Sequence, residues 1–253
     1  MQYEEYKRLY DGLNTAADVD AFESEGYDRR LLETLINQKT TRYVRKKAYI
    51  LQKDAPKMLS EWNSGRSFLD IAESRGLPPM LVAKAIFEKH GTPRKIFWEY
   101  VNDPSKLNSE ETAAELAEAR DKDLVYSPAA DMRARERGKW GESLLWKWLD
   151  EQGISYKTEA DRRDEGGKTP DCLLDEPLMF KGHKIYWIES KASFGDAMEF
   201  KYNCTHQLIP YTELFGPGVV IYWTGHVDGL EEPEGVFLED ITATESKLEK
   251  CRD

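Results

Sequence analysis

Two neighbouring apolar stretches decide how the second half of this sequence folds: K-T-P-D-C-L-L-D, residues 168–175, and I-Y-W-I-E-S-K, residues 185–191. A turn signal, Lys181–Gly182, lies between them, so we expect the two stretches to pair as a β-hairpin. Both stretches also carry charged side chains, which are costly to bury in a sheet. The hairpin therefore raises the question of what compensates these charges.

The segments around the hairpin predict helices and strands in a fixed order. We expect a helix over residues 139–151, a strand over 154–159, the hairpin, a helix over 204–215 and a strand over 218–223. The resulting order, α-β-β-β-α-β, predicts an α+β or α/β domain with a mixed sheet. We place this domain at residues 133–253.

The first half of the chain is helical by pattern and contains no strand-like run. We expect one helix from about Tyr27, a separate one over residues 56–62, and two more over 67–76 and 77–91 that are joined by a short Gly-containing turn. Such a pair predicts a helix-turn-helix, or a plain three-helix packing unit. We therefore assign residues 1–97 to a helical, winged-helix-like nucleic-acid-binding region, and 98–132 to a helical connector.

Composition excludes several classes of protein. Of the 253 residues, 40% are hydrophobic, enough for a substantial core, and 33% are charged, with a net charge of −11 that argues against general affinity for nucleic acid. No apolar run approaches the roughly 20 residues of a membrane span. The three scattered cysteines fit neither a disulfide framework nor a zinc site, so we expect an intracellular, cytoplasmic protein (nuclear and cytoplasmic in a eukaryote).

The charges of the hairpin indicate a metal site. Strand alternation places Ile185, Trp187, Glu189 and Lys191 on one face, and pairing brings Asp171 within reach of Glu189. Two adjacent carboxylates repel each other unless a cation lies between them, and their oxygens favour Mg²⁺ or Mn²⁺.

Three further side chains fit this site. Glu142 falls on the apolar stripe of its helix, where an unpaired charge is costly. Gln207 and Tyr211 are four residues apart and would share a helix face, where they contact the substrate or steady Lys191; Pro210 alters that spacing unless it lies in the first turn. Each feature also has a plain structural explanation: an edge-strand ion pair for Glu189, and a helix N-terminus for Glu142. Because all of these side chains occur within one short span of the sequence, we favour the metal site over the structural explanations.

Three strings give a resemblance to a known family: T-P-D at residues 169–171, W-I-E-S-K-A-S-F-G-D at 187–196 and F-G-P-G-V-V-I-Y-W at 215–223. They resemble the TPD-motif family, a branch of the PD-(D/E)xK nuclease superfamily. The resemblance implies a restriction-endonuclease-like core and a divalent-metal-dependent nuclease that hydrolyses phosphodiester bonds, with DNA, including branched DNA, as the expected substrate.

The resemblance also implies roles for individual residues. Asp171, Glu189 and the Ser190 carbonyl would bind Mg²⁺ or Mn²⁺, and Glu142 would bind it directly or through water. Lys191 would orient the attacking water and stabilise charge on the phosphate. The family also allows a protein partner and a homodimer.

Basic side chains on predicted helices are the expected phosphate contacts, although such runs are usually solvated helix faces. They are Arg42, Arg45, Lys46, Lys47, Arg133, Arg135 and Arg137. Two alternatives to the nuclease stay open: a catalytically silent nuclease fold that acts as a scaffold or nucleic-acid-binding protein through a protein partner, and a transcription regulator built on the helix-turn-helix.

Overall fold

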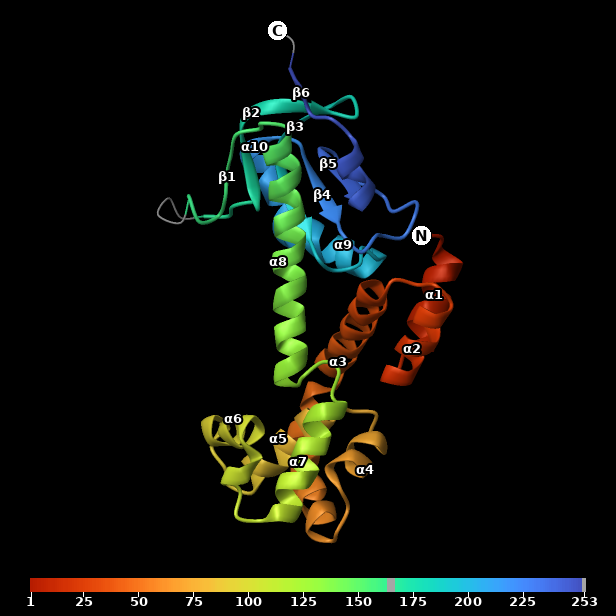
Figure 1. Ribbon diagram of the computed structural model, residues 1–253, viewed down its shortest axis with the longest axis vertical. Coiled ribbons are helices and arrows are strands. Elements are labelled where there is room, and N and C mark those ends of the chain that lie inside the picture. Colours follow the sequence, from red (N-terminus) through yellow and green to blue (C-terminus); the bar gives the residue numbers. More distant parts are fainter. Residues whose placement is uncertain (163–166, 252–253) are drawn as a thin grey trace. The chain divides into compact units, whose positions relative to one another are not determined.

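The computed structural model describes residues 1–162 and 167–251, which form two compact units (Figure 1). The first unit comprises Met1–Asn14, Asp18–Leu35 and Glu136–Asp253, and the second comprises Thr15–Ala17 and Ile36–Arg135. The helices are α1 (Tyr3–Gly12), α2 (Ala16–Ser24), α3 (Arg29–Asn63), α4 (Phe68–Glu73), α5 (Pro79–Lys89), α6 (Arg94–Asn102), α7 (Glu110–Lys122), α8 (Pro128–Glu151), α9 (Ala197–Asn203) and α10 (Ile209–Phe215), with short 3₁₀ turns at Pro104–Lys106 and Ile241–Glu245.

The second unit is all helical and has its own apolar core. Phe68 and Ile71 of α4, Ile86 of α5 and Phe97 of α6 are fully buried together. Helix α7 belongs to the same core because Leu116 and Ala119, two apolar positions in an acidic helix, are also buried there. This helix, predicted as a connector, therefore contributes to the packing of the unit.

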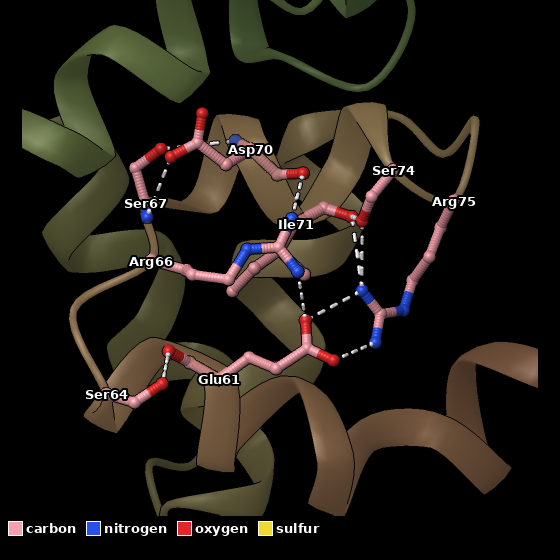
Figure 2. A network of polar contacts seen from close by, with 8 residues as sticks. All are labelled: Glu61, Ser64, Arg66, Ser67, Asp70, Ile71, Ser74 and Arg75. Carbon is pink, nitrogen blue, oxygen red and sulfur yellow. Dashed lines mark hydrogen bonds and ion pairs between the residues drawn. The ribbon is translucent and has the colours of Figure 1, made fainter.

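A polar network fixes the start of α4 and the turn that follows it (Figure 2). The Ser67 hydroxyl accepts from the backbone of Asp70, whose carboxylate accepts in return from the backbone of Ser67, which is a capping box. The carboxylate of Glu61 accepts hydrogen bonds from Arg66 at 2.7 Å and from Arg75 at 2.8 Å. The hydrogen bond from Arg75 holds the pKa of Glu61 below its usual value. These two arginines are therefore engaged within the unit.

The first unit is built on a mixed six-stranded sheet among the described residues. Its order is β1-β2-β3-β4-β5, with β6 beside β2; β2 is antiparallel to β1, β3 and β6, whereas β3–β4 and β4–β5 are parallel. The hairpin turns at Lys181 and Gly182, both with positive φ, as a two-residue loop of type I′ requires. The strands are β1 (Tyr156–Lys157), β2 (Cys172–Phe180), β3 (His183–Lys191), β4 (Gly218–Tyr222), β5 (Val236–Asp240) and β6 (Glu249–Lys250).

Helices cover both faces of this sheet (Figure 1). Leu145 and Leu149 of α8 pack on the face that carries Ile188. Phe200 of α9 and Tyr211 of α10 pack on the opposite face, against Trp187. Strand alternation therefore sends Glu189 and Lys191, which follow Trp187 at every second residue, toward α9 and α10.

Some element predictions are wrong in detail. Pro56 does not begin a helix; it lies inside α3, which continues through it because Ala55 and Met58 on either side are buried. Helix α8 begins at Pro128, eleven residues before the predicted start, with proline in its first turn. Ile185 packs with Ile188 on the α8 face, not with Trp187, because the β2–β3 register shifts between Leu173 and Leu178 and breaks the alternation.

The predicted general layout, a helical N-terminal part and a C-terminal part with a mixed sheet, agrees with the structure. The compact units divide the chain differently from the predicted ranges, since Met1–Asn14 and Asp18–Leu35 group with the sheet. None of the helices in residues 1–162 and 167–251 combines the length and the apolar character of a membrane-spanning segment.

Candidate metal centre and active site

Asp171 and Glu189 meet where β2 begins and β3 ends. The antiparallel pair Cys172↔Ile188, extended by one residue, places Asp171 opposite Glu189. The backbone N–H of Asp171 donates to Glu189 Oε2 at 3.1 Å, and the N–H of Ser190 donates to Asp171 Oδ2 at 2.8 Å. Each carboxylate is thus oriented by a backbone amide beside the other, and the structure brings together the two predicted metal ligands.

Lys191 is held at the same place by two acceptors. Its Nζ atom donates to Glu189 Oε1 at 2.6 Å and to Gln207 Oε1 at 2.8 Å. The side chains of Lys191 and Glu189 are 16% and 4% exposed, so this ion pair is largely shielded from water. The ammonium group is therefore fixed beside both carboxylates.

The protein environment disfavours the charged forms of Asp171 and Glu189. Burial raises the pKa of Asp171 above its ordinary value, while the Ser190 N–H and the Lys191 ammonium oppose this shift. Burial, and then the charge of Asp171, raises the pKa of Glu189 to about 7, although Lys191 favours its ionised form. One ammonium group does not fully compensate the two acids, and a further cation would.

Gln207 reaches Lys191 because the helix widens. A π-helical turn, Cys204–Leu208, separates α9 from α10, and such turns are frequent at functional sites. Pro210 lies in the first turn of α10, where its missing N–H costs little. Tyr211 does not join Lys191: its hydroxyl donates to the carbonyl of Thr169 at 3.0 Å and so holds the residues just before Asp171.

Glu142 approaches this site from the α8 side of the sheet. The preceding Gly141 packs closely on Trp223 and Ser190, where a Cβ atom would lie 2.5 Å from Trp223 Cδ1 and 3.1 Å from Ser190 Oγ. Burial, then the charge of Asp171, raises the pKa of the half-buried Glu142. Glu142 is thus within the electrostatic field of Asp171.

Sequence comparison places the chain in a family. A family model described as "Protein of unknown function TPD sequence-motif" matches residues 108–242, more than half of the chain, and its matched span includes the T-P-D string and the E-S-K string. The chain belongs to the TPD sequence-motif family. The resemblance drawn from these strings is therefore confirmed.

Curated relatives carry one name. CDAN1-interacting nuclease 1 of Homo sapiens is 35% identical over 181 residues, covering 68% of this chain and 64% of the human protein. The proteins of that name from Bos taurus and Xenopus laevis are 35% and 32% identical, covering 70% and 68% of this chain and 66% and 60% of their own lengths. The chain thus spans about six-tenths of these relatives. No solved structure matches it.

The donor set of this TPD-family chain fits a hard divalent cation that keeps much of its own water. Among residues 1–162 and 167–251, no group of three or more His, Cys, Asp or Glu side chains could hold a metal ion, so Asp171 and Glu189 are a two-carboxylate set. Mg²⁺ is usually bound by one or two carboxylates together with water and substrate phosphate. The β2–β3 register extended to Pro170 places it opposite Ser190, and proline has no N–H to donate to that carbonyl. The Ser190 carbonyl therefore fits as a third oxygen ligand.

The predicted phosphate-contacting residues lie in both units. Arg45 and Lys46 of α3 are exposed, Arg42 is half-buried, and Lys47 lies over the Tyr43 ring at 5.9 Å. On α8, Arg133 is half-buried, Arg135 forms an ion pair with Asp131 at 2.8 Å and Arg137 one with Glu33 at 3.6 Å. These two ion pairs partly neutralise the positive charge of Arg135 and Arg137. Contact of these seven basic residues with phosphate stays a prediction.

Sequence reasoning missed three contributors to the site. Thr169 offers the carbonyl that Tyr211 holds. The Trp223 indole donates to Ser190 Oγ at 2.7 Å and so fixes a residue of the E-S-K string. Exposed Glu159, two residues past β1, raises the pKa of both Asp171 and Glu142 by its charge. Its only signal in the sequence is the acidic end of the first predicted strand.

Proposed function

We propose that this chain is a divalent-metal-dependent nuclease of the PD-(D/E)xK type that hydrolyses phosphodiester bonds of DNA. The observation that carries the proposal is Lys191, fixed by Glu189 and Gln207 next to Asp171. A largely buried ammonium beside two carboxylates, where β2 begins and β3 ends, suits the binding of a cation and a phosphate together. The relatives' name, which describes them as nucleases, supports the proposal.

Each residue has a role in this proposal. Asp171, Glu189 and the Ser190 carbonyl would hold Mg²⁺ or Mn²⁺, with Glu142 reaching it through water. When bound, the cation supplies Lewis acidity toward the phosphate and lowers the pKa of its water. Lys191 neutralises charge on the phosphate oxygens and orients the attacking water, and Gln207 keeps its ammonium group in place.

The order of helices and strands along the chain supports the proposed restriction-endonuclease-like core. A helix, three strands, a helical segment and a further strand follow one another from α8 to β4, in the predicted α-β-β-β-α-β order. The helical unit would bind the DNA duplex through α4 and α5, in the manner of a helix-turn-helix, and a homodimer stays part of the proposal by analogy.

Cleavage assays with matched variants test the proposal. The purified chain is incubated with single-stranded, duplex, flap and four-way-junction DNA, and with RNA, with Mg²⁺, with Mn²⁺ or with chelator. Asp171→Asn and Lys191→Ala should abolish cleavage, whereas Asp175→Asn and Lys184→Ala, exposed residues on the same strands, should not. Intact substrates in every wild-type reaction, or equal cleavage by Asp171→Asn, would contradict the proposal.

A second candidate is a scaffold that acts through a protein partner. It is favoured by the name of the relatives, which describes them as interacting with CDAN1. Titration of Mg²⁺ and Mn²⁺ into wild type and Asp171→Asn separates the two candidates. Cation binding that depends on Asp171, without cleavage of any substrate, would favour the scaffold. A nuclear or cytoplasmic site of action is proposed with either function.

A further inference from the structure

A pair of stacked aromatic rings lies on the surface beside the candidate site. Tyr202 of α9 and His206 of the π-helical turn stack with ring centroids 4.2 Å apart and planes 19° from parallel. Tyr202 is 53% exposed and His206 is also exposed. Each ring covers one face of the other, and the pair still presents aromatic surface to solvent on which a further flat group can stack.

The pair is held in a fixed conformation. His206 Nδ1 lies 3.0 Å from the carbonyl of Tyr202, which can only accept, so Nδ1 carries the hydrogen. The backbone of both residues belongs to the helical segment that runs from α9 into the π-helical turn. Rings held in this way lose little entropy when another flat group stacks on them.

The pair is tied to both segments that form the candidate site. His206 directly precedes Gln207, which binds Lys191. The carbonyl of His206 accepts from Lys168 Nζ at 2.6 Å, and Lys168 lies three residues before Asp171. Lys168 is exposed, and this hydrogen bond places its positive charge next to the backbone of His206.

We propose that Tyr202 and His206, with Lys168, form a stacking platform for an unpaired base of a nucleic-acid strand that enters the site. The proposal rests on the proposed nuclease function and specifies its substrate class: DNA with a single-stranded segment, such as a flap or a frayed end. A base inside a duplex has both faces stacked on its neighbours, whereas an unpaired base can stack on exposed aromatic rings while its phosphate pairs with a nearby cation.

Binding and cleavage are measured separately. Anisotropy of a labelled 15-nucleotide single-stranded DNA and of a blunt duplex is recorded for the full chain in chelator, so that no cleavage occurs. Tyr202→Ala should weaken single-strand binding by about 5- to 150-fold, the range for one stacked base, and leave duplex binding unchanged. Tyr202→Phe should bind as wild type does, and Tyr202→Leu, which keeps apolar area without a ring, should resemble Tyr202→Ala.

A base analogue reports stacking directly. 2-Aminopurine within the single strand should lose fluorescence on binding to wild type and to Tyr202→Phe but not to Tyr202→Ala. Equal single-strand affinity of wild type and Tyr202→Ala, or an equal loss for duplex and single strand, would overturn the platform. If Tyr202-dependent binding persists while no substrate is cleaved, the platform stands and the nuclease proposal fails. Cleavage of the flap substrate by Tyr202→Ala at the wild-type rate would leave the nuclease proposal standing without this platform.

Discussion

Substitution of Gly141 by alanine tests the closest approach between α8 and the sheet. The added Cβ would lie 2.5 Å from Trp223 Cδ1 and 2.9 Å from its Nε1, and Trp223 is only 3% exposed. Overpacking of a core costs about 1–3 kcal/mol. Loss of the Trp223–Ser190 hydrogen bond costs about 1 kcal/mol, which roughly offsets the gain in helix propensity from glycine to alanine. We therefore expect Gly141→Ala to lower the free energy of unfolding by about 1–3 kcal/mol.

Gly138, one turn earlier on α8, provides the matched control. A Cβ at this position meets nothing within 4 Å, so Gly138→Ala should raise stability by about 0.5–1 kcal/mol. Urea denaturation followed by tryptophan fluorescence and circular dichroism gives both values. If the two variants unfold at the same urea concentration, α8 does not press on Trp223 and Ser190. The position inferred for Glu142 beside Asp171 would then be wrong as well.

Two further predictions concern hydrogen bonds to buried carboxylates. Tyr6→Phe removes the hydroxyl group that donates at 2.8 Å to Asp196, whose side chain belongs to a residue only 2% exposed, and should lower the free energy of unfolding by about 1.5–3 kcal/mol in urea denaturation. Tyr3→Phe, at a residue that is 58% exposed, is the control and should change it by almost nothing. Equal effects of the two substitutions would contradict this role of Tyr6. Asp123→Ala removes the acceptor of three backbone N–H groups and should destabilise the helical unit by about 2–4 kcal/mol. The control is Asp121→Ala, at an exposed aspartate two residues earlier, whose stability should differ from that of wild type by no more than about 0.5 kcal/mol. Burial raises the pKa of Asp123, so the folded state binds its proton more tightly than the unfolded chain, and the stability of wild type relative to Asp123→Ala should increase as the pH falls from neutral toward about 4; a constant difference would contradict that shift.

Local signals in the sequence were enough to predict the hairpin, and the helix caps are equally local features. The turn at Lys181–Gly182 needs positive φ at two successive residues, and glycine at the second position is a strong signal for it. Ser67 and Ser109 cap α4 and α7 because their hydroxyl groups reach backbone amides three residues later. These features depend on a few adjacent residues, which is why a single sequence reveals them.

Features that depend on distant packing could not be predicted in this way. Pro56 breaks an isolated helix, yet α3 continues because buried neighbours on both sides stabilise it. The π-helical turn at Cys204–Leu208 has no local signature, and the shift in the β2–β3 register depends on contacts across the sheet. The direction of Tyr211 followed from neither spacing nor composition, because its partner is the backbone carbonyl of Thr169, forty-two residues earlier.

The charged cluster at the open end of the hairpin, where β2 begins and β3 ends, is better explained by function than by stability. A purely structural pair, Glu189 and Lys191, would need no second acid, yet Asp171 lies beside it with a raised pKa. Replacement of a buried ion pair by apolar residues is often neutral or stabilising, so stability alone gives little reason to keep such a cluster. A carboxylate that is costly in the free protein becomes favourable once a divalent cation binds to it. We therefore expect Asp171→Asn to leave the chain at least as stable as wild type in chelator, and to remove the stabilisation that Mg²⁺ or Mn²⁺ gives to wild type.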